Sequence, residues 1–116
     1  MGQQPQYAKS SKSPFMPRLR YSDEARDDLM RLAEFWREKS PNVAVEALNA
    51  ILLTIDTLTL NPLIGRPYMI ADYCFRELVI AFGKGGYLAL YAYDEQADSV
   101  DVLAIRHQRE LKYNDF

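Results

Sequence analysis

Hydrophobic residues recur at helical spacing between residues 22 and 60, in two stretches separated by a short break. The first stretch is otherwise charged, and its apolar positions are Ala25, Leu29, Leu32, Ala33 and Trp36. The second stretch is apolar at Ala44, Ala47, Leu48, Ile51, Leu52, Ile55 and Leu58. Residues three or four positions apart lie on the same face of a helix. The pattern therefore predicts a helical hairpin whose two apolar faces can pack on one sheet.

The break and the two ends of this segment carry signals for helix boundaries. Ser22 is a suitable N-cap and is followed by two acidic residues, which the helix dipole favours in a first turn. The dipeptide Ser40-Pro41 restarts the chain, because a proline at the first helical position loses no hydrogen bond. Asn61-Pro62 ends the second helix. The expected helices therefore lie on either side of Ser40.

After residue 61 the period changes to that of strands. The stretches rich in β-branched and aromatic residues are 75–82, 86–93 and 99–106. A glycine-rich turn separates the first two, and a short polar segment separates the last two, so both connections suit antiparallel hairpins. The last strand is apolar on both faces, which predicts a central strand covered on both sides. Residues 61–67, NPLIGRP, are interpreted as a loop.

A short strand candidate, residues 17–21, precedes the helices. The expected order along the chain is therefore strand, helix, helix and three strands. This order predicts the α+β class, with an N-terminal strand and a helical hairpin packed on one face of an antiparallel β-meander.

Composition sets limits on domain number and compartment. The chain has 116 residues, 48% of them hydrophobic, which suits one domain. Residues 1–15 are polar and lack the apolar core of a secretory signal. We expect a flexible leader over residues 1–15 and a single domain over residues 16–116. One cysteine, Cys74, excludes an intrachain disulfide and a Cys-rich zinc site and favours a cytoplasmic setting. The unbroken apolar runs are too short to predict a membrane span.

The balance of charged residues limits the classes of function that suit the chain. Lys and Arg number 14 and Asp and Glu 16, for a net charge of -2. Residues 76–116 alone hold five basic and seven acidic residues. A protein that binds nucleic acid through its overall charge is usually basic, so that class is disfavoured. The acids of the first helix are spaced for pairs with its own cations, and residues 83–86 lack the spacing of a phosphate loop. We expect no metal and no cofactor.

Five motifs in order resemble one protein family, the RelE/ParE superfamily of type II toxin–antitoxin toxins. The resemblance covers about residues 16–113. It rests on the segments NPLIGRP, RELVI, GYLALYAYD and VDVLAIRHQRE. Family members typically show the features found here at Asn61-Pro62, Gly65-Arg66, Arg76, His107 and Arg109. The fold of the family agrees with the order of elements predicted above.

The resemblance implies a small prokaryotic toxin that inhibits growth, in systems that include plasmid stabilisation, and that a cognate antitoxin neutralises. Antitoxins of the family usually lay a helical segment, and sometimes a strand, over the groove and helices of the toxin. RelE-like members cleave mRNA on the ribosome, whereas ParE-like members inhibit DNA gyrase and are not known as nucleases. Neither branch implies direct DNA binding by the toxin itself or a membrane partner.

The basic residues near the C-terminus are the candidates for chemistry. An mRNA interferase must activate a 2′-hydroxyl, stabilise a phosphorane-like charge and protonate a leaving oxygen. His107 is the acid–base candidate, Arg76 and Arg109 are the charge stabilisers, and Tyr113 can stack on a base. The alternative for His107 is a strand-end residue that bonds backbone or contacts the antitoxin.

The candidate residues for binding a target or an antitoxin form a wider set: Phe35, Arg66, Arg76, Arg106, His107, Arg109 and Tyr113. Phe35 belongs to it because it lies off the apolar stripe of the first helix. Arg66 has a second interpretation, in which Gly65 supplies a turn with positive φ and Arg66 is a surface cation or pairs with a helix acid.

Three functions stay open at this point. The acidic balance and the ending AIRHQRE favour a ParE-like toxin that binds DNA gyrase without catalysis. The cluster around His107 supports the alternative of a ribosome-dependent endoribonuclease. The third possibility is a non-toxic member that only binds its antitoxin.

Overall fold

The computed structural model describes residues 16–110, 112 and 113, so the expected leader over residues 1–15 lies outside the described residues. The elements in chain order are β1 (Arg18–Tyr21), α2 (Asp23–Lys39), α3 (Pro41–Asp56), a 3₁₀ turn (Thr57–Thr59), β2 (Arg66–Ile70), β3 (Tyr73–Phe82), β4 (Gly85–Asp94) and β5 (Ser99–His107). The predicted order of strand, helix, helix and three strands is confirmed, with one additional strand after the helices.

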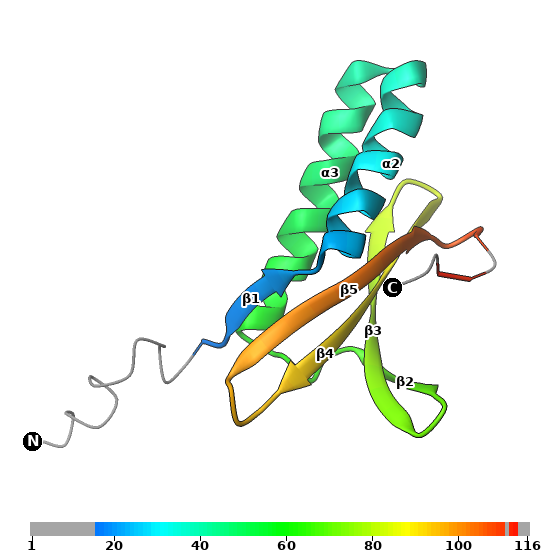
Figure 1. Ribbon diagram of the computed structural model, residues 1–116. Coiled ribbons are helices and arrows are strands. Elements are labelled where there is room, and N and C mark those ends of the chain that lie inside the picture. Colours follow the sequence, from blue (N-terminus) through cyan, green and yellow to red (C-terminus); the bar gives the residue numbers. More distant parts are fainter. Residues whose placement is uncertain (1–15, 111, 114–116) are drawn as a thin grey trace, which may run out of the picture.

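The five strands form one mixed sheet in the order β1-β5-β4-β3-β2 (Figure 1). Strand β1 pairs with β5 in parallel, and the other neighbours are antiparallel. The interior position predicted for the last strand is confirmed. The prediction was wrong for β2, which occupies part of the expected loop. Its first two residues, Arg66 and Pro67, are exposed on a sheet edge, where a proline is tolerated because no neighbouring strand needs its N–H.

Serine side chains define the helix boundaries, as predicted. The hydroxyl of Ser22 accepts a hydrogen bond from the backbone N–H of Ala25 at 3.0 Å and donates one to the carbonyl of Leu103. The hydroxyl of Ser40 accepts from the N–H of Val43, while its own N–H bonds the carbonyl of Trp36. Ser40 therefore ends α2 and begins α3, which folds the two helices into a tight hairpin.

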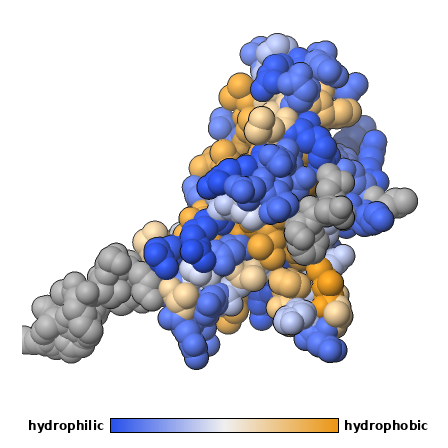
Figure 2. Space-filling view, in the orientation of Figure 1, coloured by the Kyte–Doolittle hydropathy of each residue, from blue (hydrophilic) through white to orange (hydrophobic). Residues whose placement is uncertain are grey.

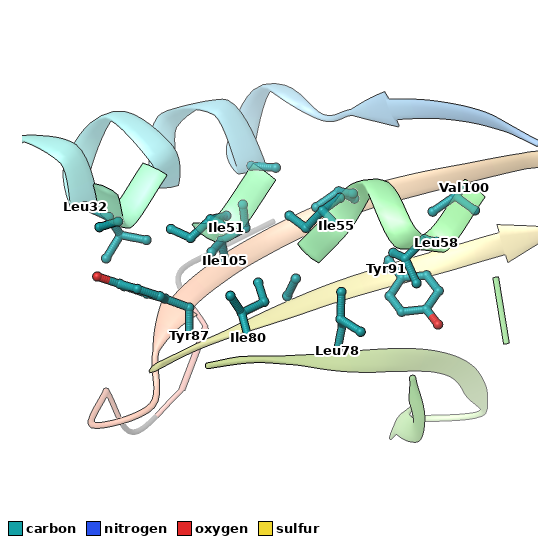
Figure 3. Packing of buried hydrophobic residues seen from close by; sticks show 14 residues of the cluster. Leu32, Ile51, Ile55, Leu58, Leu78, Ile80, Tyr87, Tyr91, Val100 and Ile105 are labelled. Carbon is teal, nitrogen blue, oxygen red and sulfur yellow. The ribbon is translucent and has the colours of Figure 1, made fainter. Parts of the chain in front are cut away.

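Both helices cover the same face of the sheet and enclose the main core (Figure 1). Ile51, Ile55 and Leu58 are fully buried on the α3 side. Figure 3 shows them pointing toward side chains of three strands, Leu78, Ile80, Tyr87, Tyr91, Val100 and Ile105. A smaller cluster on the opposite face consists of Leu88, Leu90, Ala104 and Tyr113. The sheet is therefore apolar on both faces, but only one face carries helices.

The segment Pro41–Thr59 is long and apolar enough, by length and composition alone, to cross a membrane. In this fold its inner face is buried against the sheet through Ala44, Ala47, Ile51 and Ile55. Its outer face exposes Val45, Leu52 and Leu53. Figure 2 shows hydrophobic residues along the α3 side of the hairpin, beside a mainly hydrophilic α2. Helix α3 therefore packs on the core with its inner face and leaves its apolar outer face exposed.

Candidate functional site

The sheet register divides the candidate residues between its two faces. His107 pairs with Tyr87 and Arg106 with Leu88, so the two neighbours point to opposite sides. The ring of His107 packs edge-on against Tyr87 on the helix side, with 5.4 Å between centroids. The guanidinium of Arg106 lies over the ring of Tyr113 at 4.9 Å on the other side. His107 and Tyr113 therefore do not share a site.

On the helix side, a pocket of about 470 Å³ lies between α2 and the adjoining ends of β4 and β5. Its apolar walls come from Leu32, Phe35 and Trp36 of α2 and from Tyr87 of β4. The indole N–H of Trp36 donates a hydrogen bond to the hydroxyl of Tyr87, which joins helix to sheet. Burial raises the pKa of Tyr87. We call this cavity the helix-side pocket.

Charged groups form the rim of the helix-side pocket. Arg31 donates to a carboxylate oxygen of Glu110 at 2.9 Å, and the other oxygen of Glu110 accepts the backbone N–H of His107 at 2.7 Å. Nδ1 of His107 accepts the backbone N–H of Arg109 at 3.0 Å, so in the neutral ring the proton lies on Nε2. These bonds fix the turn after β5 and place Arg109 at the rim.

Two cations of the rim have no carboxylate partner among the described residues. The ammonium of Lys39 lies over the ring of Phe35, 5.0 Å from its centroid. Arg109 is exposed, and its guanidinium forms no ion pair within residues 16–110, 112 and 113. The pocket therefore combines apolar walls with unneutralised positive charge at its edge.

On the opposite face, a buried carboxylate holds together a second group of polar residues. Glu77 is 3% exposed and accepts hydrogen bonds from Arg66 at one oxygen and from the hydroxyl of Tyr113 at the other. Burial and the contact with Glu77 raise the pKa of Tyr113. Arg106 also donates to the carbonyl of Glu110. We call Glu77, Arg66, Tyr113 and Arg106 the Glu77 cluster.

Arg76 belongs to neither group. Its guanidinium donates to the carbonyl of Gly65 at 2.6 Å and to that of Leu63 at 3.1 Å. The hydroxyl of Tyr91 accepts the N–H of Gly65 at 2.9 Å and donates to the carbonyl of Pro62 at 2.7 Å. Two side chains of the sheet thus hold the loop between the 3₁₀ turn and β2.

The second interpretation was wrong for Gly65 and for a helix acid as the partner of Arg66, but Arg66 does lie at the surface, with its side chain 62% exposed. The described glycine with positive φ is Gly83, in the β3–β4 turn. Gly65 is needed for space, because a Cβ atom there would lie 2.7 Å from the ring of Tyr91. Arg66 pairs with Glu77 of β3 and not with an acid of the helices.

Of the seven residues selected from the sequence, the structure brings together Phe35, His107 and Arg109 in the helix-side pocket. Arg66, Arg106 and Tyr113 meet around Glu77, and Arg76 braces the loop. Glu77 itself was missed. A single acid inside the apolar strand run RELVI was the available signal, because a charge at such a position must find a partner when buried.

The acids of α2 also differ from expectation. Asp28 was expected on the helix surface, but it is 5% exposed and accepts the backbone N–H of Ile105 at 2.8 Å. It also pairs with Arg31. Glu34 pairs with Arg37 on the surface, in the manner expected of a helix. Among the residues that the structure describes, no group of three His, Cys, Asp or Glu is arranged to hold a metal ion.

Comparison with known proteins gives one family and two instructive structures. The sequence profile described as "ParE toxin of type II toxin-antitoxin system, parDE" matches residues 19–112. The fold is similar to the toxin–antitoxin complex RelBE2 (Rv2865-2866) from Mycobacterium tuberculosis, with a TM-score of 0.58 and 23% identity over 80% of this chain and 99% of that one. It is also similar to the chromosomal ParDE system from P. aeruginosa, with a TM-score of 0.66 and 20% identity over 80% and 97%. A comparison with curated protein sequences gives no match.

Proposed function

The chain belongs to the ParE toxin family of type II toxin–antitoxin systems, within the RelE/ParE superfamily, and on that premise we propose that it inhibits growth by binding DNA gyrase. In this proposal a cognate antitoxin neutralises the toxin by covering its target-binding surface. The two similar solved structures are toxin–antitoxin systems, which supports an antitoxin as partner. The action on gyrase is binding, without a catalytic step by the toxin.

One observation carries the preference for binding over RNA cleavage: Glu77 neutralises Arg66 and binds the hydroxyl of Tyr113, which removes two polar groups of the Glu77 cluster from contact with a phosphate. Cleavage needs cations that are free to meet a developing phosphorane and a group that exchanges a proton near neutral pH. Arg66 is bound to Glu77, and the raised pKa of Tyr113 keeps its phenol protonated and bonded to the same carboxylate. Within the Glu77 cluster this leaves Arg106, which contacts the carbonyl of Glu110 and the ring of Tyr113, as the cation without a carboxylate partner, and no acid–base group beside it.

The separation of the nuclease candidates supports the same conclusion. His107 lies on the helix side of the sheet, Tyr113 lies on the opposite side, and Arg76 is engaged with loop carbonyls. Groups that act on one phosphate must lie within hydrogen-bond reach of it. The four residues proposed for mRNA cleavage therefore have no common centre in this conformation.

An mRNA interferase is the second candidate, on one specific observation. His107 and Arg109 do share the helix-side pocket, so an acid–base group and a cation lie together there. In this alternative the ribosome with its mRNA replaces gyrase as the target. The partner that would complete such a site must come from the ribosome.

A supercoiling assay tests the proposal. Relaxed plasmid is converted by gyrase with ATP, and the purified toxin is added at increasing excess, with toxin premixed with antitoxin as the control. We expect inhibition that the antitoxin abolishes. Normal supercoiling at large toxin excess would contradict the gyrase target.

Two further measurements separate the alternatives. Primer extension on translated mRNA would show codon-phased cuts if the protein is an interferase, and these cuts should disappear in His107→Ala. Expression of the toxin without its antitoxin should arrest bacterial growth under either toxic mechanism. Unimpaired growth would favour a family member that only binds its antitoxin.

A further inference from the structure

We propose that two copies of this chain associate through the outer face of α3, with the two helices antiparallel about a two-fold axis at Asn49. We call this surface the α3 outer face and define it by Val45, Asn49, Leu52, Leu53 and Asp56. The proposal goes beyond the proposed function, because self-association through this face requires neither gyrase nor an antitoxin.

Large apolar side chains are exposed along the α3 outer face. Leu53 is 68% exposed, Val45 59% and Leu52 37%. They lie at helical spacing and point away from the buried side of the helix, which packs on the sheet through Ala47 and Ile51. Figure 2 shows hydrophobic residues along the α3 side of the hairpin. An apolar patch of this kind marks a surface that another molecule covers.

The spacing of these residues makes the α3 outer face complementary to itself. Val45, Asn49 and Leu53 follow one another at intervals of four, so Asn49 lies midway between two apolar side chains. In an antiparallel pair centred on Asn49, Val45 of each copy meets Leu53 of the other. Each such contact occurs twice, as a two-fold interface requires.

The exposed amide of Asn49 sets the register of this pair. At the axis the two amides face each other, and each can donate a hydrogen bond to the other and accept one from it. A shift of the helices would place the amide against Val45 or Leu53, where it has no such partner. A single polar residue inside an apolar helix interface specifies register and oligomeric state in this way.

The charges of α3 suit an antiparallel pair and oppose a parallel one. The helix holds two acids, Glu46 and Asp56, and no basic residue. In the antiparallel register Asp56 lies opposite Asn42 of the other copy, at the N-terminus of its α3, where the helix dipole favours an acid. Glu46 lies opposite Leu52. In a parallel pair each acid would face its own copy, and like charges at an interface repel.

Anionic partners do not suit this face. Nucleic acids and anionic membranes are attracted by lysine and arginine, whereas α3 presents only carboxylates. The segment Pro41–Thr59 is apolar enough by composition to enter a membrane, but its inner side is part of the core through Ile51 and Ile55. A second copy of the chain carries the matching apolar and polar positions.

The size of the face predicts a weak dimer. α3 has 16 residues, which corresponds to about 24 Å of helix, and only one side of it is available. A standard stable interface takes about 800 Å² from each partner, over about 20–30 residues. We therefore expect a dissociation constant of about 10–100 µM.

Sedimentation velocity of the purified full chain, without antitoxin, measures this association from about 5 to 500 µM. The sedimentation coefficient should rise from that of a monomer to that of a dimer. Asn49→Asp and Leu53→Glu should each weaken association about 10-fold or more, because they place a carboxylate in the apolar contact. The matched controls are Gln96→Glu in the exposed β4–β5 turn and Met69→Glu on β2, which change the net charge equally.

A charge-pair rescue tests the position of the axis. Asn49→Asp and Asn49→Lys should each associate weakly alone, because two like charges meet where the axis passes. An equimolar mixture of the two variants should form a heterodimer at least as tight as the wild-type dimer, since opposite charges then meet. Restoration in the mixture is expected only if position 49 contacts itself.

Disulfide cross-linking tests the register in a Cys74→Ser background, which lacks the single native cysteine. Helices packed about 8–10 Å apart, with Cα atoms about 2.3 Å from each axis, bring two facing Cα atoms to about 4–6 Å. A disulfide spans about that distance. Asn49→Cys should therefore form a covalent dimer under mild oxidation, read on a non-reducing gel. Arg37→Cys, exposed on α2, is the control and should remain monomeric.

Several outcomes would overturn the proposal. A wild-type chain that stays monomeric up to about 500 µM, or unchanged association in both Asn49→Asp and Leu53→Glu, would remove the face from any dimer. Association without an Asn49→Cys cross-link would place the contact elsewhere. Loss of vesicle binding or of antitoxin affinity in Leu53→Glu, with a monomeric wild type, would assign the face to a membrane or to the antitoxin.

Thermal melting followed by circular dichroism controls for folding. A variant that melts lower than the wild type is replaced by Leu53→Gln, for which a smaller loss of association is expected. None of these measurements includes gyrase, so a failure of the proposed gyrase inhibition would leave the decision on self-association intact.

Discussion

Replacement of Tyr113 by phenylalanine isolates one hydrogen bond in the Glu77 cluster. The hydroxyl of Tyr113 donates to a carboxylate that is 3% exposed, and the ring packs edge-on against Tyr68 and under Arg106. Phenylalanine keeps the ring and its packing but leaves one oxygen of Glu77 without this donor. The change therefore tests whether the buried carboxylate depends on the C-terminal segment.

The expected magnitude follows from the charge of the acceptor. A hydrogen bond to a charged group contributes about 1.5–3 kcal/mol, and an unsatisfied buried acceptor adds a desolvation penalty. Arg66 still bonds the other oxygen of Glu77, which limits the loss. We expect Tyr113→Phe to reduce the free energy of unfolding by about 2 kcal/mol, or to lower the melting temperature by roughly 5–10 °C.

Urea unfolding followed by circular dichroism measures this difference, and Tyr73→Phe is the matched control because Tyr73 is 69% exposed. A double-mutant cycle with Glu77→Gln separates the pair from other contacts of the ring. Both single variants should lose stability, and the double variant should lose less than their sum. A loss below about 0.5 kcal/mol for Tyr113→Phe, or strict additivity in the cycle, would refute the hydrogen bond as a source of stability.

Three other changes test different parts of the fold. Gly65→Ala should lower the free energy of unfolding by about 1–3 kcal/mol, because the new Cβ would lie 2.7 Å from the ring of Tyr91. The shift of the midpoint of urea unfolding measures this loss. Asp28→Ala should lower the free energy of unfolding by about 2 kcal/mol, because it leaves the buried N–H of Ile105 without its acceptor and removes one of the two carboxylates that bind Arg31. Thermal melting measures this loss. Burial and Asp56 raise the pKa of Tyr21 to about 12, so its contribution to stability is present below about pH 10 and is lost between pH 10 and 12. Tyr21→Phe should therefore flatten the alkaline loss seen in melting curves of the wild type.

The main elements could be predicted because local signals and the tertiary fold agree. Ser22 and Ser40 are caps in the sequence and in the structure, and the apolar stripes of both helices face the core except at Leu52, which was expected in the stripe and is exposed. The strand β2 could not be predicted, because an edge strand that begins with Arg66-Pro67 has neither the apolar alternation nor the donors of a central strand. The parallel pairing of β1 with β5 could not be predicted from the sequence for another reason. It joins residues 18–21 to residues 99–102, and no local pattern encodes so distant a partner.

The functional residues were likewise predictable where the signal is local and not where it depends on distant contacts. Phe35 was selected because it lies off the apolar stripe, and it does stand exposed at the lip of the pocket. His107 and Tyr113 were grouped because they are close in sequence, but strand alternation and the turn after β5 place them on opposite faces. Glu77 and Asp28 were missed as buried acids. Their partners are the distant residues Tyr113 and Ile105, which only the folded sheet brings near.

The net charge of -2 says less about where a charged partner can bind than the position and pairing of each charged residue. On the face opposite the helices, Glu77 neutralises Arg66 and binds the phenol of Tyr113, whereas Arg106 has no carboxylate partner among the described residues. On the helix side, Glu110 is already bound to Arg31 and to the backbone of His107, so it cannot compensate Arg109. One buried acid thus neutralises one of the two cations of the Glu77 cluster. In the helix-side pocket, one partly buried acid binds Arg31 and leaves Arg109 without a carboxylate, and the pairing of individual acids therefore determines where positive charge remains on each face.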